Sequence, residues 1–344
     1  MKKKIVQIAI IVSGLLSLGL FCSCDKSESY VSDEQVQTMC LTLNLNYESN
    51  EYLHDSSAAE GQDGNLGSEQ CASTRFIVRA YGLDNGKRNK QHSHEFTFTE
   101  SYTQPTNQNL NIELPAGDYD ILIWSDIVQG DKFFYDASDF SRIKLLGDHQ
   151  GNNTFRDAFY GIASVSSLNQ SNDISAQSVE VAMQRPLAKF ELIANDITQF
   201  RESEMERSAS ENMGARGLAD INIDDYTVVF QYVGYMPSMF SLFTEKPVDS
   251  ATGVVFTSTL TKLSDTEVSL GFDYVFVNNK DSAVTIKVAV FDKEGNLVSL
   301  TSPTRVPLKR NYHTVLCDNY LSVKTSDGIG IDTEYDGDHN VVLP

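Results

Sequence analysis

Basic residues are scarce in this sequence. The 344 residues include 27 Lys and Arg against 47 Asp and Glu, which gives a net charge of −20 at pH 7. A chain this acidic repels phosphate backbones, so its charge argues against nucleic acid as a partner. The same surplus of acid is typical of a solvated extracellular surface.

Cysteine is equally sparse, with five residues in the whole chain. Beyond residue 24 only Cys40, Cys71 and Cys317 remain, and their spacing fits neither a metal site nor a dense disulfide scaffold. One Cys40–Cys71 bridge stays open as an alternative in an oxidising compartment. We therefore predict no metal and no cofactor.

The residues that carry catalysis or bind metals form no recognisable constellation. The six histidines are scattered, and we expect them to be solvated: His54, His92, His94, His149, His313 and His339. The acidic end, residues 332–338, partly imitates a calcium loop, but Leu343 stands where the bidentate Glu belongs, so an exposed tail is favoured. No two carboxylates are placed by the sequence across a cleft. We predict that the chain is not an enzyme, and a hydrolase is the least favoured alternative.

The first 24 residues carry a targeting signal. Three lysines at positions 2–4 precede an apolar run over 5–21, and then come Cys22, Ser23 and Cys24. The run approaches the length of a membrane-spanning helix, but its small-residue and cysteine end favours a cleavable signal over 1–23. The ending resembles a bacterial lipobox in which Cys24 is lipidated. Cys22 fits less well because bulky Phe21 precedes it.

Lipidation would make Cys24 the first residue of the mature protein and anchor it to a membrane without crossing it. The polar residues 24–38 are then expected to form a flexible tether. Asp25 and Glu28 resemble the acidic export tag of surface lipoproteins in the Bacteroides group, although Lys26 interrupts it. We expect an outer-membrane, lipid-anchored protein on the cell surface.

Short runs of β-branched and aromatic residues, bounded by Gly, Asn, Asp and Pro, recur along the rest of the chain. This pattern predicts antiparallel β structure. About 320 mature residues predict two domains of roughly 150 residues each. In the first domain, 39–185, strands are expected at 39–47, 75–81, 94–100, 110–114, 119–125 and 158–164, followed by an alternating run from 179 that ends before Pro186.

The segment 114–124 is the most informative part of the first domain. Pro115 and Gly117 favour a turn, and the strand after it is apolar on both faces, with Ile121 and Ile123 opposite Leu122 and Trp124. Such a strand is central and covered on both sides. The single tryptophan, Trp124, is therefore predicted to be a core residue rather than a sugar-stacking platform.

The second domain, 186–344, is predicted to begin at Pro186, which cannot donate to a strand ladder. A short helix is expected at 197–208. Strands are expected at 188–192, 225–232, 254–259, 266–277, 283–292, 297–300 and 312–316. In the longest of these, Val268, Leu270, Phe272, Tyr274 and Phe276 are expected to share one apolar face. The architecture predicted is all-β, with two tandem antiparallel β-sandwiches.

A family resemblance rests on an ordered series of blocks. They are the lipobox, the turn at 114–119 leading to Trp124, and the segments 158–161, 185–190, 271–277 and 306–310. In this order they resemble the fimbrillin-related surface lipoproteins of Bacteroidales, closest to the Mfa2/FimB-like anchor and accessory subunits. The resemblance implies two transthyretin-like sandwiches, a role as fimbrial anchor, accessory or structural subunit, and no enzymatic activity.

The resemblance also implies how partners are engaged. Stalk subunits of that family can be trimmed by an arginine-specific protease, and a neighbour's strand then fills the groove that opens. Here Arg75 is the first basic residue after Lys26, so cleavage there would detach the strand 39–47. Anchors of that family keep this strand, and Arg75 equally fits the start of the next strand. The expected partners are other fimbrial subunits, through strand addition or end-to-end docking, and the outer membrane.

Two alternatives stay open. A surface glycan-binding lipoprotein is motivated by 15 tyrosines and Trp124 among β-strands, and a host or glycan ligand would suit it. The terminal segment 340–343 is either a donated strand or the last edge strand of its own domain. The edge strand is favoured because the segment is short and the glycines before it make its approach flexible.

Overall fold

A computed structural model describes residues 37–48, 72–102, 107–167, 177–210, 222–278, 282–322 and 341–342. These residues belong to one compact unit that begins at Gln37. The predicted signal over 1–23 and most of the tether lie outside the described residues. Most of the described chain forms strands, and α1 is the single α-helix among the described residues. The all-β prediction is confirmed.

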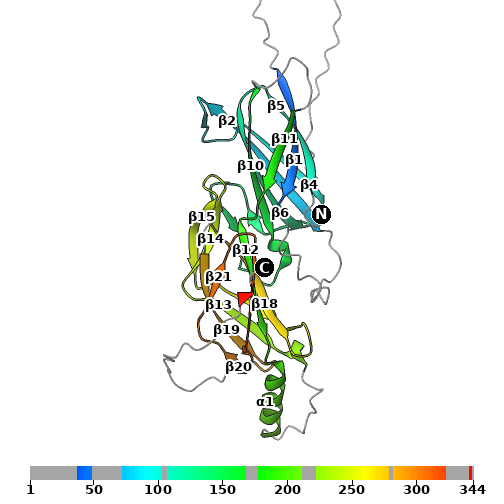
Figure 1. Ribbon diagram of the computed structural model, residues 1–344, viewed down its shortest axis with the longest axis vertical. Coiled ribbons are helices and arrows are strands. Elements are labelled where there is room, and N and C mark those ends of the chain that lie inside the picture. Colours follow the sequence, from blue (N-terminus) through cyan, green and yellow to red (C-terminus); the bar gives the residue numbers. More distant parts are fainter. Residues whose placement is uncertain are drawn as a thin grey trace, which may run out of the picture. The chain divides into compact units, whose positions relative to one another are not determined.

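The first sandwich packs two sheets around an apolar core (Figure 1). One sheet has the order β11-β1-β5. The other has the order β10-β6-β2-β3, with β4 and β7 paired to β2 and β6. The bounds are β1 (Thr38–Tyr47), β2 (Ala72–Asp84), β3 (Lys87–Arg88), β4 (His94–Ser101), β5 (Gln108–Pro115), β6 (Tyr119–Gln129), β7 (Lys132–Phe133), β10 (Ala158–Val165) and β11 (Gln177–Met183).

The second sandwich repeats this plan around its own core. Its sheets have the orders β17-β18-β12-β22-β23 and β16-β13-β19-β20, with β21 paired to β19. The bounds are β12 (Leu187–Ala194), α1 (Ile197–Ser210), β13 (Thr227–Tyr232), β16 (Val255–Thr259), β17 (Thr261–Lys262), β18 (Val268–Phe276), β19 (Ser282–Phe291), β20 (Leu297–Leu300), β21 (Thr304–Leu308), β22 (His313–Asp318) and β23 (Val341–Val342). In each sandwich the first strand runs parallel to a late one, β1 beside β11 and β12 beside β22. All other ladders between described strands are antiparallel.

A third sheet, which the sequence pattern did not predict, has the order β15-β14-β9-β8. Its strands are β8 (Tyr135–Asp136), β9 (Ile143–Leu145), β14 (Tyr235–Ser241) and β15 (Lys246–Thr252). β9 comes before the predicted boundary at 185/186 and pairs with β14 beyond it. A third apolar cluster accordingly takes residues from both halves of the chain, among them Leu122, Trp124, Phe240 and Phe276. The boundary itself stays a prediction.

Strand β18 corrects the predicted apolar face. Val268 and Leu270 lie in the core of the second sandwich, whereas Tyr274 and Phe276 lie in the third cluster. The cause is a bulge: the register with β12 shifts between Leu192 and Ile193, opposite Gly271, whose φ is +135°. One extra residue in a strand moves every later side chain to the other face.

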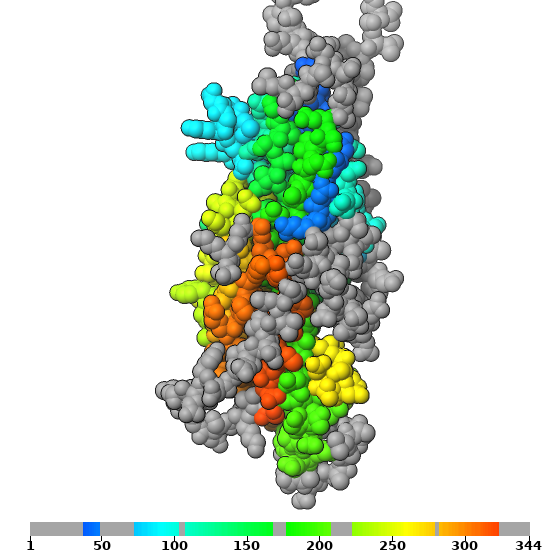
Figure 2. Space-filling view, viewed as in Figure 1, coloured from blue at the N-terminus to red at the C-terminus, as the bar shows by residue number. Residues whose placement is uncertain are grey.

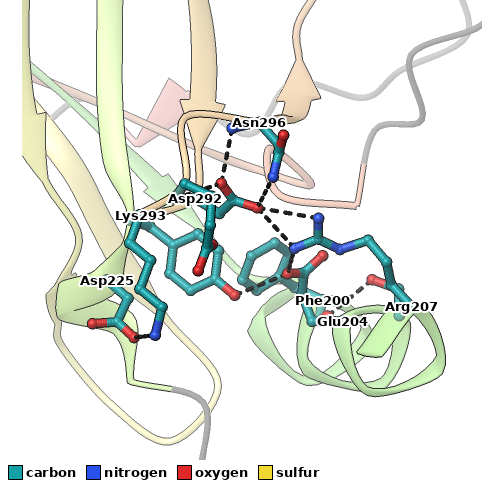
Figure 3. Close-up of polar contacts among 10 residues, drawn as sticks. Phe200, Glu204, Arg207, Asp225, Asp292, Lys293 and Asn296 are labelled. Atoms are coloured by element: carbon teal, nitrogen blue, oxygen red, sulfur yellow. Dashed lines mark hydrogen bonds and ion pairs between the residues drawn. The ribbon is translucent and has the colours of Figure 1, made fainter. Parts of the chain in front are cut away.

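Helix α1 closes one end of the second core and is held there by a polar network (Figure 3). Ile197 and Phe200 are buried in the core. The Arg207 guanidinium donates to Glu204 Oε2 at 2.7 Å and to Asp292 Oδ2 at 3.1 Å. Asp292 also accepts the Asn296 backbone N–H at 2.8 Å. One arginine therefore links the helix to the turn between β19 and β20.

Candidate strand-exchange site

Strand β1 is the centre of its three-stranded sheet. Its ladder with β5 runs antiparallel from the pair Thr38–Pro115 to the pair Leu45–Gln108. Its ladder with β11 runs parallel from Leu41–Gln177 to Tyr47–Met183. Backbone groups on both sides of β1 are therefore paired, and removing the strand would leave β5 and β11 with unpaired edges.

The inward face of β1 supplies a row of core side chains. Met39, Leu41, Leu43 and Leu45 are between 0 and 2% exposed. Burying an apolar side chain of this size contributes about 1.5–3 kcal/mol, so the row contributes roughly 6–12 kcal/mol. A whole domain is stable by only about 5–15 kcal/mol. The first sandwich therefore needs either β1 or a strand that replaces it.

The outward face of β1 is polar, and its hydrogen bonds fix the register. Thr42 Oγ1 donates to Asn111 Oδ1 at 2.9 Å. The side-chain amides of Asn44 and Asn46 donate to Glu180 at 2.5 and 2.7 Å. These two amides hold the pKa of the Glu180 carboxyl below its usual range. A replacement strand would match this site best with the same alternation of apolar and amide side chains.

Arg75, the predicted processing residue, lies within β2. Its backbone pairs with Thr99 on β4 and with Asp126 on β6. Its guanidinium donates to Asp126 Oδ1 at 2.8 Å and to Asp126 Oδ2 at 2.5 Å, and it lies 4.7 Å from the centre of the Phe133 ring. The Arg75 side chain is 14% exposed, and that of Asp126 is fully buried.

This setting determines what cleavage after Arg75 would require. A protease binds its substrate as an extended segment with a free backbone, but β2 is paired on both sides at this position. Cleavage would need β2 to open and the buried Asp126 carboxylate to lose its partner, which is costly. Processing at Arg75 stays a prediction, and the folded geometry opposes it.

Cys24 and Cys71 lie outside the described residues, so lipidation and a Cys40–Cys71 bridge also stay predictions. Cys40 is on the outward face of β1, opposite Glu113. β1 begins at Thr38, one residue before the predicted strand start at 39. Gln37 is the one described residue before β1. The predicted tether leads from there back to Cys24.

Trp124 is a core residue, as predicted. Its side chain is fully buried in the third cluster and makes an edge contact with Tyr135 at 5.4 Å between ring centres. The two faces of β6 also separate as expected, with Ile121 and Ile123 in the first core and Leu122 beside Trp124. No stacking platform for a sugar is available at Trp124.

The prediction that all the histidines are solvated is wrong for two of them. His149 Nε2 lies 2.6 Å from Asp273 Oδ2, inside a buried cluster that also contains Arg156 and Tyr232. His313 lies 3.2 Å from Glu191 and is 11% exposed. Burial alone would raise the pKa of Asp273, but Arg156 and His149 outweigh it and lower the pKa. No local pattern signals this cluster, because single charged residues far apart in the chain meet only in the fold.

The described residues contain no group of three or more His, Cys, Asp and Glu placed to hold a metal ion. Nor is any described helix long and apolar enough to cross a membrane. His54, His339 and the acidic segment 332–338 lie outside the described part of the chain. The strand favoured at 340–343 is confirmed as an edge strand of its own domain, since β23 pairs antiparallel with β22.

Known proteins resemble this chain at low sequence identity. Among solved structures, the chain is similar to the fimbrial anchor protein Mfa2 from Porphyromonas gingivalis, with 10% identity and a TM-score of 0.38 over 81% of this chain and 90% of that one. It is also similar to the tip fimbrial protein Mfa3 from Porphyromonas gingivalis, with 10% identity and a TM-score of 0.38 over 82% of this chain and 94% of that one. No curated protein matches the sequence. One family model matches residues 33–344, and the chain therefore belongs to DUF6562, a family of unknown function.

Proposed function

We propose that this chain is a non-catalytic, lipid-anchored subunit of a cell-surface fimbria, and that it acts as an anchor or accessory subunit at the base of the filament. The observation that carries the proposal is the position of β1. The strand that follows the predicted lipid tether is also the central strand of its sheet, with four core side chains on its inner face. One strand would therefore connect the proposed membrane anchor directly to the folded core.

The tether limits how far the protein stands from the membrane. An extended chain spans at most about 3.3–3.6 Å per residue, so the segment from Cys24 to Thr38 reaches roughly 50 Å. A lipid on Cys24 would hold the first sandwich within that distance of the membrane surface. This suits a subunit at the base of a filament.

The filled groove supports a terminal position. A subunit that keeps β1 has no empty place between β5 and β11, so it cannot accept a neighbour's strand there. It can end a filament but not extend it through this groove. The ladders on both sides of Arg75 favour retention of β1. The ordered sequence blocks that resemble fimbrillin-related lipoproteins support the fimbrial part of the proposal.

Lipid attachment is tested by substituting the two candidate cysteines separately in the organism that makes the protein. With Cys24→Ala we expect loss of palmitate labelling, release from the membrane fraction and filaments shed into the medium. Cys22→Ala is the matched control, because it keeps the predicted lipobox cysteine, and it should behave like the wild type. Labelling and membrane retention that survive Cys24→Ala would overturn the anchor proposal.

A further inference from the structure

An open cleft of about 410 Å³ shares no residue with the strand-exchange site. It is lined by Arg88, Asn89, Lys90, Asp120 and Phe243. The first three belong to the hairpin of β2 and β3 and the residues that follow it, and Phe243 comes from the turn between β14 and β15. In Figure 2 the β2–β3 hairpin, in cyan, projects from the surface beside the yellow-green strands β14 and β15.

The cleft is more basic than the molecule around it. It is lined by two cations, Arg88 and Lys90, against one carboxylate, Asp120, in a chain of net charge −20. A local cationic surface on an acidic protein raises the concentration of anionic ligands at that place. The cleft therefore favours a ligand with negative charge.

Arg88 is held in position through Nε, and its two terminal nitrogens lack a described side-chain partner. Its Nε donates to Asp120 Oδ2 at 2.7 Å, and Asp120 Oδ1 accepts from Ser164 Oγ at 2.6 Å. No described side chain is bonded to the two terminal nitrogens of Arg88. A fixed guanidinium with two free N–H groups side by side matches the two oxygens of a carboxylate.

Phe243 adds an apolar wall. Its ring is 36% exposed and makes an edge contact with Tyr81 at 5.4 Å between centres. The Arg88 guanidinium lies 5.5 Å from the same ring. The ring is thus supported, accessible and beside a cation, and the apolar C–H face of a pyranose can pack on such a ring while its polar edge reaches the guanidinium.

From these features we propose that the cleft between the β2–β3 hairpin and Phe243 binds a carboxylate-bearing sugar, such as a uronic or sialic acid residue of a glycan. Arg88 pairs with the sugar carboxylate, Lys90 adds a second cation, Phe243 packs against the ring and Asn89 is available to the hydroxyls. A peptide of acidic residues alone, such as poly-glutamate, could use the cations but has no ring to pack on Phe243. The inference does not depend on fimbrial assembly, since no residue of β1 lines the cleft.

The test uses the full chain purified in detergent and isothermal titration calorimetry with trisaccharides that carry galacturonate, glucuronate or sialate. We expect at least one to bind, its methyl ester to bind at least tenfold more weakly, and affinity to fall as salt increases. Phe243→Ala and Lys90→Gln should each weaken binding about tenfold. Both residues are exposed, so neither substitution should unfold the protein, and circular dichroism checks this.

Two exposed residues elsewhere serve as matched controls, Tyr235→Ala for the aromatic ring and Lys262→Gln for the lysine, and both variants should bind like the wild type. Absence of binding by all three sugars would overturn the proposal. It would also be overturned if the ester bound equally well, if poly-glutamate bound as tightly as the sugar, or if Phe243→Ala had no effect. None of these outcomes bears on membrane anchoring, which the Cys24 variant tests separately.

Discussion

At the scale of single residues, the first sandwich depends most on the inward side chains of β1. Leu43 is fully buried between the two sheets of this sandwich. We expect Leu43→Ala to lower the free energy of unfolding by about 2–5 kcal/mol, through lost burial and the cavity left behind. Urea unfolding of the full chain measures this change.

Thr42→Ala, on the outward face next to Leu43, is the control for that experiment. It removes one exposed hydrogen bond, to Asn111, and should cost no more than about 1 kcal/mol. Equal effects of the two substitutions would contradict the placement of β1 with its leucines inward.

The buried Asp273 predicts a dependence of stability on pH. Asp273→Asn leaves the buried Arg156 guanidinium without its counter-charge, and at pH 7 this should cost about 3–5 kcal/mol. The folded-state pKa of Asp273 is lowered, so its contribution is complete above the unfolded value of about 3.9 and is lost as pH falls through the lower folded value.

The difference between wild type and Asp273→Asn should therefore shrink as the pH falls from about 5 towards about 3. Urea midpoints at several pH values measure it. Asp265→Asn is the control, because that residue lies at the surface beside Lys262 and should change stability little at any pH. A wild-type advantage that stays constant across this range would contradict the proposed role of the Asp273 charge.

Single residues also mark where sequence reasoning succeeds. Trp124 could be placed in the core because the strand around it is apolar on both faces. Asp273 could not be recognised as buried, because its partners Arg156, His149 and Tyr232 come from distant parts of the chain. Alternation reports which face a side chain takes, but it carries no information about which distant charges meet.

At the scale of elements, alternation located most of the long strands, and the helix expected at 197–208 matches α1. It missed β14 and β15, which contain Pro237 and Pro247 and lack a regular apolar face. Their sheet depends on β9, three residues long, as a neighbour. Such strands form because of tertiary pairing, and no local pattern announces them.

The bulge in β18 carries a prediction at the same scale. Gly271 has φ of +135°, and a Cβ there would lie 2.7 Å from Ser258 Oγ and 2.9 Å from Ser258 Cβ. We expect Gly271→Ala to destabilise the protein by roughly 2–4 kcal/mol through backbone strain and crowding. Thermal and urea unfolding would measure it.

Gly253→Ala is the matched control for the bulge. Gly253 also has a positive φ, +68°, but a Cβ there meets no atom within 4 Å. Gly253→Ala should lower the free energy of unfolding by about 1–2 kcal/mol, which is the strain of the left-handed backbone alone. A Gly271 variant as stable as the Gly253 variant would show that the bulge relaxes freely, which would contradict the crowding expected against Ser258.

At the scale of the whole molecule, the two sandwiches share one plan, in which an early strand lies parallel beside a late one. In the first sandwich that early strand is β1, which directly follows the segment leading from Cys24. The proposed anchor thus combines a lipid, a short tether and a strand that fills its own groove. The acidic surface and the cationic cleft would then face the outside of the cell.

The most direct test of the anchor role is to shear filaments from the cells and blot for the protein in the filament and outer-membrane fractions, after cross-linking. We expect the full-length chain in the membrane fraction, cross-linked to a filament subunit. Regular incorporation along sheared filaments, as a chain that begins after Arg75, would contradict the anchor role and indicate a stalk subunit. Absence from filaments with no cross-link to any subunit would contradict fimbrial function altogether.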